Sequence, residues 1–206
     1  MPRVSMRDVL IEAGQKVLHE RGYAATAVQD IAAVAGVPKG SFFNHFGTKE
    51  AFAALALERY VSVNEAWLAN LMDDDSLPVL QRITMLIDAV NDRLKATGGR
   101  EGCMVGNLSI EVAGASEPLR AQLSDAFGRW CAPLAGALER AQARGEIALT
   151  VDPATMANFI QNGLQGAILR AKVDRTSAPV DQFKVILLDL LRQGEAEVKQ
   201  TIPKRP

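Results

Sequence analysis

Residues 26–46 read TAVQDIAAVAGVPKGSFFNHF, and this stretch decides the architecture of the N-terminal part of the chain. Thr26 and the glutamine three residues later predict a capped helix over 28–35, which Gly36 ends. Pro38 suits the first turn of a second short helix that closes the stretch. Two short helices joined by a tight turn are typical of a helix-turn-helix, whose second helix presents its outer face to the major groove of DNA.

The second helix carries hydrogen-bonding side chains on its outer face, namely Lys39, Ser41, Asn44 and His45. Lysine and asparagine reach base edges or phosphates, and Lys49 at the start of the next helix is placed to hold a phosphate. A helical hairpin with a solvated polar face is the alternative, because this spacing alone is weakly specific. An unusual concentration of aromatic residues favours the DNA-binding interpretation, because it indicates that these short helices form a small independent core. These residues are Phe42, Phe43, Phe46 and Phe52.

The rest of the chain has helical periodicity almost throughout, without the alternation typical of strands. An acidic run at 73–75 marks a loop, and Pro133 is expected to bend or split the longest helix. The expected helices lie at about 48–72, 80–94, 103–113, 116–144, 153–172 and 179–198. We therefore predict an all-α protein of about nine helices. Residues 1–50 form a three-helix helix-turn-helix domain, and residues 51–206 form a helical ligand-binding and dimerisation domain.

Composition narrows the function classes. The chain has 206 residues with 23 Lys and Arg against 24 Asp and Glu, so any DNA contact must be a local patch. Two cysteines, Cys103 and Cys131, argue against a disulfide scaffold. We find no zinc spacing, dinucleotide motif or phosphate loop, and we expect no metal or cofactor. Neither a signal peptide nor a membrane span is evident, so we expect no membrane partner and a cytoplasmic location.

The segment TAVQDIAAVAGVPKGSFFNHFGTKEAF closely resembles the DNA-binding signature of TetR-family transcriptional regulators. The resemblance covers residues 5–50, and the chain length and all-α remainder agree with it. It implies a homodimer that binds a palindromic double-stranded DNA operator and releases it on binding a small-molecule effector. By position it places Thr26, Lys39, Ser41, Asn44, His45 and Lys49 against DNA. Phe43 departs from the family, which usually has a phosphate-contacting tyrosine there, so we expect Phe43 to pack in the core.

The C-terminal helices carry a candidate subunit interface. Residues 153–169 contain no charged side chain, and Gly163, Gly166 and Ala167 allow close helix approach. The alternative is an ordinary core helix with one solvent-exposed face. The last expected helix has a broad apolar face that would complete a four-helix dimer seam. In the resembled family the last two helices make the dimer.

The segment REGCMVGNLSIEVAG carries the strongest local signal for sensing. Cys103 begins a helix after Gly102, and a helix N-terminus with Arg100 nearby favours negative charge on the thiol. Asn107 lies one turn further on the same face. A small buried core cysteine is the alternative reading. By helical face we also place Phe127, Trp130, Phe159 and Gln161 in a ligand pocket.

The segments GCMVGNLSIEVAGASEPLR and GAILRAK are similar to the branch of this family that contains N-ethylmaleimide-responsive and acrylate-responsive repressors. This resemblance implies an electrophilic or α,β-unsaturated effector. Two other classes compete with a ligand-responsive repressor. A cysteine-dependent enzyme needs a base near its thiol, and both histidines lie in the N-terminal domain, so we expect no enzyme. An architectural helical dimer is disfavoured by the near-neutral charge.

Overall fold

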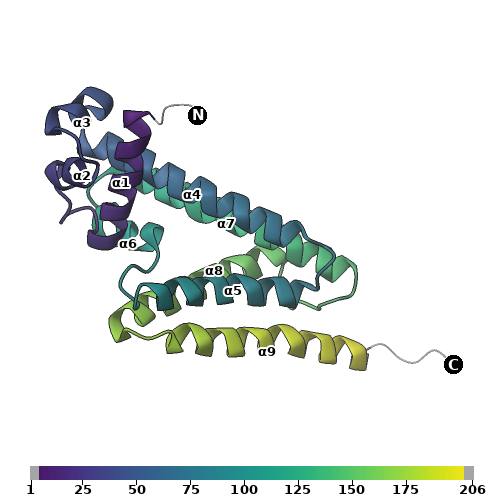
Figure 1. The fold of residues 1–206 in the computed structure, drawn as a ribbon. Coiled ribbons are helices and arrows are strands. Elements are labelled where there is room, and N and C mark those ends of the chain that lie inside the picture. Colours follow the sequence, from purple (N-terminus) through teal and green to yellow (C-terminus); the bar gives the residue numbers. More distant parts are fainter. Residues whose placement is uncertain (1–4, 202–206) are drawn as a thin grey trace. The chain divides into compact units, whose positions relative to one another are not determined.

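The computed structural model describes residues 5–201, and side chains as far as Arg192. Within that range it has nine α-helices and no strand, which confirms the all-α prediction (Figure 1). The helices are α1 (Met6–Arg21), α2 (Val28–Val34), α3 (Lys39–Phe46), α4 (Lys49–Asp73), α5 (Val79–Ala96), α6 (Met104–Val112), α7 (Glu117–Ala143), α8 (Pro153–Asp174) and α9 (Ala178–Thr201).

Local signals explain most helix boundaries. The Thr48 hydroxyl accepts the Ala51 N–H at 3.0 Å at the start of α4, and Asp152 accepts the Thr155 N–H at 2.9 Å at the start of α8. Gly47 ends α3 with a φ of 70°, a left-handed conformation that costs other residues energy. These boundaries agree with the sequence analysis to within a few residues.

One local expectation was wrong. The N-cap of α2 is Ala27, whose N–H donates to the Asp30 carboxylate at 2.9 Å, and not Thr26. The Thr26 hydroxyl instead donates to the Gly22 carbonyl at 2.6 Å, so it stabilises the preceding loop and does not cap α2. Of the two outcomes expected at Pro133, the split does not occur, because α7 runs unbroken through this residue, and the bend stays a prediction.

Residue contacts divide the chain into two compact units. The first unit holds α1 to α3, α6, and the N-terminal parts of α4 and α7, because it comprises residues up to Asn64 together with Glu101–Ala126. Its centre is a cluster of three buried rings, Phe42, Phe46 and Phe52, whose centroids lie 4.9 to 5.2 Å apart. Helix α1 passes this cluster at Gly14, where a Cβ would lie 2.1 Å from the Phe52 ring. The boundary at residue 50 stays a prediction.

The second unit comprises Glu65–Arg100 and the chain from Phe127 onward. Helices α8 and α9 pack against each other, and both contact α5. Helix α8 approaches Phe183 of α9 closely at Gly163, where a Cβ would lie 2.4 Å from the Phe183 ring. Among the residues described, no helix is long and apolar enough to cross a membrane.

Candidate nucleic-acid interface and sensing segment

The turn between α2 and α3 is held by backbone geometry. Gly36 has a φ of 67°, and the Val37 N–H donates to the Ala32 carbonyl at 3.0 Å. Pro38 then precedes the first residue of α3. Ile31 and Phe42 are fully buried between the two helices, so their packing fixes which face of α3 points outward. This is the predicted helix-turn-helix arrangement.

Four of the predicted DNA-facing residues lie together on α3. Lys39, Asn44 and His45 are exposed, and Ser41 is half-buried. The exposed side chains offer an ammonium, an amide and an imidazole, groups that donate to base edges and phosphates. The geometry of α3 therefore suits contact with a nucleic acid, and the assignment of single contacts stays a prediction.

The other two predicted residues serve the unit itself in this structure. Thr26 is 1% exposed, and its hydroxyl is the one bonded to Gly22. The Lys49 ammonium donates to the Tyr23 carbonyl at 2.5 Å and lies 4.2 Å from the centre of the Tyr23 ring. Partial desolvation lowers the pKa of Lys49 below its usual range, although the charge of Glu111 acts in the opposite direction. Lys49 thus holds the loop between α1 and α2.

Phe43 contradicts the expectation of a core residue. Its side chain is 45% exposed, while the neighbouring Phe42 is fully buried. Phe42 and Phe46 are one helical turn apart and take the inward positions, which turns Phe43 about 100° away from the core. The sequence already contains this spacing. Counting the phenylalanines together instead assigned all of them to one core.

Cys103 is the N-cap of α6 and is 8% exposed. The Asn107 N–H donates to the Cys103 carbonyl at 2.8 Å, and the Asn107 side-chain amide donates to the Glu101 carbonyl at 2.7 Å. Asn107 therefore fixes the backbone on both sides of Gly102. The structure brings these two predicted residues together on one short segment.

Helix α6 is tied to the N-terminal helices at both of its ends. His19 on α1 lies 3.0 Å from the Gly102 carbonyl through Nε2, which must be the donor because a carbonyl only accepts. The other ring nitrogen of His19 lies 3.7 Å from the Glu101 carboxylate. At the far end, the Glu111 carboxylate accepts the Ala24 N–H at 2.7 Å. The sequence reasoning missed these contacts, because it assigned His19 to the N-terminal domain and Cys103 to the C-terminal one.

The remaining predicted pocket residues belong to the second unit. Phe127 and Trp130 meet edge to face with centroids 6.4 Å apart, and Trp130 is buried. On α8, Gln161 is 7% exposed whereas Phe159 is 52% exposed. Residues two apart in a helix point to nearly opposite sides, so Phe159 and Gln161 do not share a face. Their assignment to a pocket stays a prediction.

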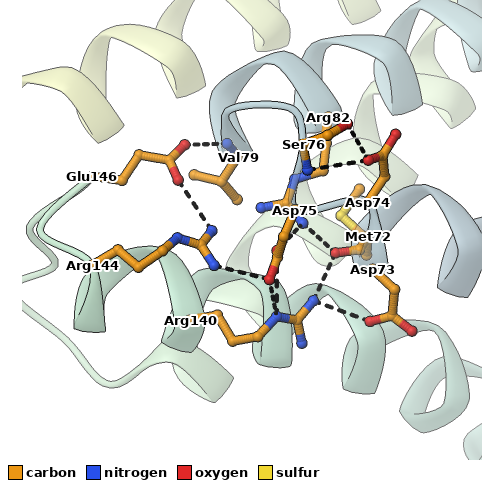
Figure 2. A network of polar contacts seen from close by, with 10 residues as sticks. All are labelled: Met72, Asp73, Asp74, Asp75, Ser76, Val79, Arg82, Arg140, Arg144 and Glu146. Atoms are coloured by element: carbon orange, nitrogen blue, oxygen red, sulfur yellow. Dashed lines mark hydrogen bonds and ion pairs between the residues drawn. The ribbon is translucent and has the colours of Figure 1, made fainter.

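A polar network that the sequence did not reveal surrounds Asp75, in the loop after α4 (Figure 2). Asp75 accepts from Arg82 at 3.0 Å and from Arg144 at 2.9 Å, and Arg140 lies 3.3 Å from it. Partial desolvation raises the pKa of Asp75, but the bond from Arg144 and the charges of the three arginines outweigh it, so the pKa lies below its usual range. The carbonyl of Met72, in the last turn of α4, also accepts from Arg82 and from Arg140.

Two further contacts extend this network. Arg140 also bonds Asp73, at 3.0 Å. Glu146 accepts from Arg144 at 3.3 Å and from the Val79 N–H at the start of α5. Figure 2 shows these groups converging from the end of α4, from α5 and from the end of α7. The network therefore joins three helices of the second unit. Within residues 5–192, no group of three His, Cys, Asp or Glu side chains is placed to hold a metal ion.

The N-terminal part of the chain is a helix-turn-helix whose second helix, α3, exposes hydrogen-bond donors, and a helical body follows it. This combination is that of a DNA-binding transcriptional regulator. Residues 10–56 match the model of "Bacterial regulatory proteins, tetR family", and residues 79–187 match that of "Tetracyclin repressor-like, C-terminal domain". The chain therefore belongs to the TetR family of transcriptional regulators.

Individual relatives match along most of their length. The chain is 37% identical to the HTH-type transcriptional repressor DhaR of Mycobacterium sp. (strain GP1), covering 93% of this chain and 94% of that one. It is 35% identical to the transcriptional regulator AcuR of Cereibacter sphaeroides, covering 84% and 80%. The crystal structure of the reduced form of Escherichia coli NemR superposes with a TM-score of 0.84 at 26% identity, covering 90% and 96%. The predicted resemblance to the branch of N-ethylmaleimide-responsive and acrylate-responsive repressors is thereby confirmed.

Proposed function

We propose that this protein is a ligand-responsive repressor that binds a palindromic operator as a homodimer in the cytoplasm and leaves it when a small electrophile is bound. The outward face of α3 carries the proposal, because it presents Lys39 and Asn44 as exposed donors on a short helix fixed by a buried core. The likeness to a named repressor, DhaR, supports repression over activation. A gel-shift titration with DNA upstream of the protein's own gene, with and without N-ethylmaleimide, tests it.

Replacing Lys39 with alanine is expected to weaken operator binding by about 1–3 kcal/mol if this lysine contacts a base. If it contacts a phosphate instead, the loss is the same for every sequence and the salt dependence of binding falls by about one counterion. Fluorescence anisotropy at several salt concentrations separates the two outcomes. Lys95→Ala removes the same charge from an exposed position on α5 and is the matched control. Unchanged affinity in both Lys39→Ala and Asn44→Ala would refute this recognition face.

The exposed apolar side chains of α8 and α9 support the dimer. Phe159, Leu169 and Val173 on α8 are 52%, 48% and 71% exposed, and Ile186 and Leu190 on α9 are 69% and 43% exposed. On α8, the positions 159, 166, 169 and 173 follow steps of seven, three and four residues, which places them along one stripe. Gly166 lies in that stripe with open space where its side chain would be, so a second copy can approach closely there. A two-fold dimer through these helices covers this apolar surface.

Ile186→Asp is expected to convert the dimer into a monomer at micromolar concentration, because a buried interface tolerates an unpaired carboxylate poorly. Sedimentation equilibrium measures the mass. Val34→Asp makes the same kind of change at a 54% exposed position on α2, and its mass should stay that of the parent. A parent protein that is monomeric at this concentration and still binds its operator would contradict the proposal. In the dimer the two α3 helices would lie about 34–36 Å apart, or somewhat more.

For sensing we propose Cys103. The Cys103 side chain would add through its sulfur to the β-carbon of an α,β-unsaturated carbonyl, and the proton that the sulfur gives up would be balanced by one taken up at the α-carbon. Support comes from the two ties between α6 and the N-terminal helices, at His19 and at Glu111. An adduct on the 8% exposed Cys103 side chain must displace its surroundings, and Gly102, which His19 holds, is the adjacent residue. Displacement there would disturb α1, which packs on α2 of the helix-turn-helix.

A further inference from the structure

An aromatic ring, that of Phe43, is exposed on α3. Phe43 is 45% exposed, and it stands between Gly40 one turn before it and Asn44 after it. Gly40 has no side chain, and the space where one would lie is open. Phe43 is therefore an exposed aromatic side chain on the same short helix as the polar donors Lys39, Asn44 and His45.

The core of the first unit does not need this ring. Phe42, Phe46 and Phe52 complete the buried cluster, and Phe43 touches it only edge-on, 5.6 Å from the centre of Phe42. The Lys39 ammonium lies 5.9 Å from the Phe43 ring centre. A phenylalanine has no group that hydrogen-bonds a phosphate, so its partner on DNA must be apolar.

The major groove has one apolar group among its base edges, the C5-methyl of thymine. We propose that Phe43 reads a thymine in each half-site through that methyl group and so specifies one base pair of the operator. The proposal rests on the proposed function, because α3 must enter the major groove. It adds an apolar contact to the donors that the sequence singled out.

Deoxyuridine tests this contact directly, since it lacks only the methyl and keeps the hydrogen-bonding edge of thymine. The operator is first defined by selection of the full-length protein on random duplex DNA, and each thymine is then replaced singly. We expect one position per half-site at which the replacement weakens binding about fourfold, and about 15-fold when both half-sites are changed. The fourfold change corresponds to about 0.8 kcal/mol for one buried methyl group.

Variants of Phe43 complete the test. Phe43→Ala is expected to bind more weakly and to lose the difference between thymine and deoxyuridine, while Phe43→Leu keeps an apolar contact and part of that difference. Circular dichroism melting confirms that both variants fold. The proposal is overturned if no thymine is sensitive, if the selected half-site has no thymine, or if Phe43→Ala keeps the full sensitivity. A protein that selects no sequence at all refutes the proposed function as well.

Discussion

Replacing Arg82 with alanine is expected to lower the free energy of unfolding of the second unit by about 3–5 kcal/mol. Arg82 is the largest fully buried side chain among the described residues, and it donates to the Met72 carbonyl and to Asp75. Alanine leaves a cavity and removes one of the two arginines that satisfy the end of α4. Both tryptophans, Trp67 and Trp130, belong to this unit, so their fluorescence during urea unfolding measures the effect.

Methionine at the same position separates the effect of losing the guanidinium group from the effect of losing side-chain volume. The Nε and Nη2 donors of Arg82 are buried without a hydrogen-bond partner, a cost that methionine removes while it fills much of the space. Arg82→Met is therefore expected to recover most of the stability that Arg82→Ala loses. Lys95→Ala, on the exposed side of α5, should change the stability by less than about 0.5 kcal/mol. An alanine variant that costs under about 1 kcal/mol, or a methionine variant as unstable as alanine, would contradict this account.

Treatment with N-ethylmaleimide is expected to weaken operator binding of the parent protein about 150-fold, and Cys103→Ser should lose this response while binding DNA as before. The factor corresponds to about 3 kcal/mol of coupling between the two sites, at the upper end of typical values. The adduct supplies this energy only if it is tolerated better in the conformation that does not bind DNA. Anisotropy titrations before and after treatment measure the change, and intact-mass spectrometry counts the adducts.

Two variants control the experiment. Cys131→Ser should respond as the parent does, because desolvation raises the pKa of the Cys131 thiol and keeps it in its unreactive form. His19→Leu should still form the adduct at Cys103 but release the operator less, since the tie between Gly102 and α1 is gone. If Cys103→Ser releases DNA as the parent does, the Cys103 side chain only packs in the core, and the effector acts without a covalent bond to it.

Helix positions and the helix-turn-helix were predictable because their causes lie within a few residues along the chain. The caps Thr48 and Asp152 and the stop at Gly47 act on neighbours within one helical turn. The cap of α2 was mistaken because the Thr26 hydroxyl bonds the Gly22 carbonyl, while the Asp30 carboxylate accepts the N–H of the actual N-cap, Ala27. Family membership followed from the same local stretch, since its residues form a contiguous signature.

What the amino-acid sequence determined by itself is thus the set of helices, the exposed donors of α3 and the apolar character of α8 and α9. The tertiary structure alone decided which residues meet across long separations: His19 and Gly102 are 83 residues apart, and Arg140 and Asp75 are 65 apart. Such pairs depend on the path of the whole chain, which periodicity and capping do not specify. For that reason α6 was expected in the C-terminal domain, whereas its contacts join it to α1 and to the loop between α1 and α2 in the first unit.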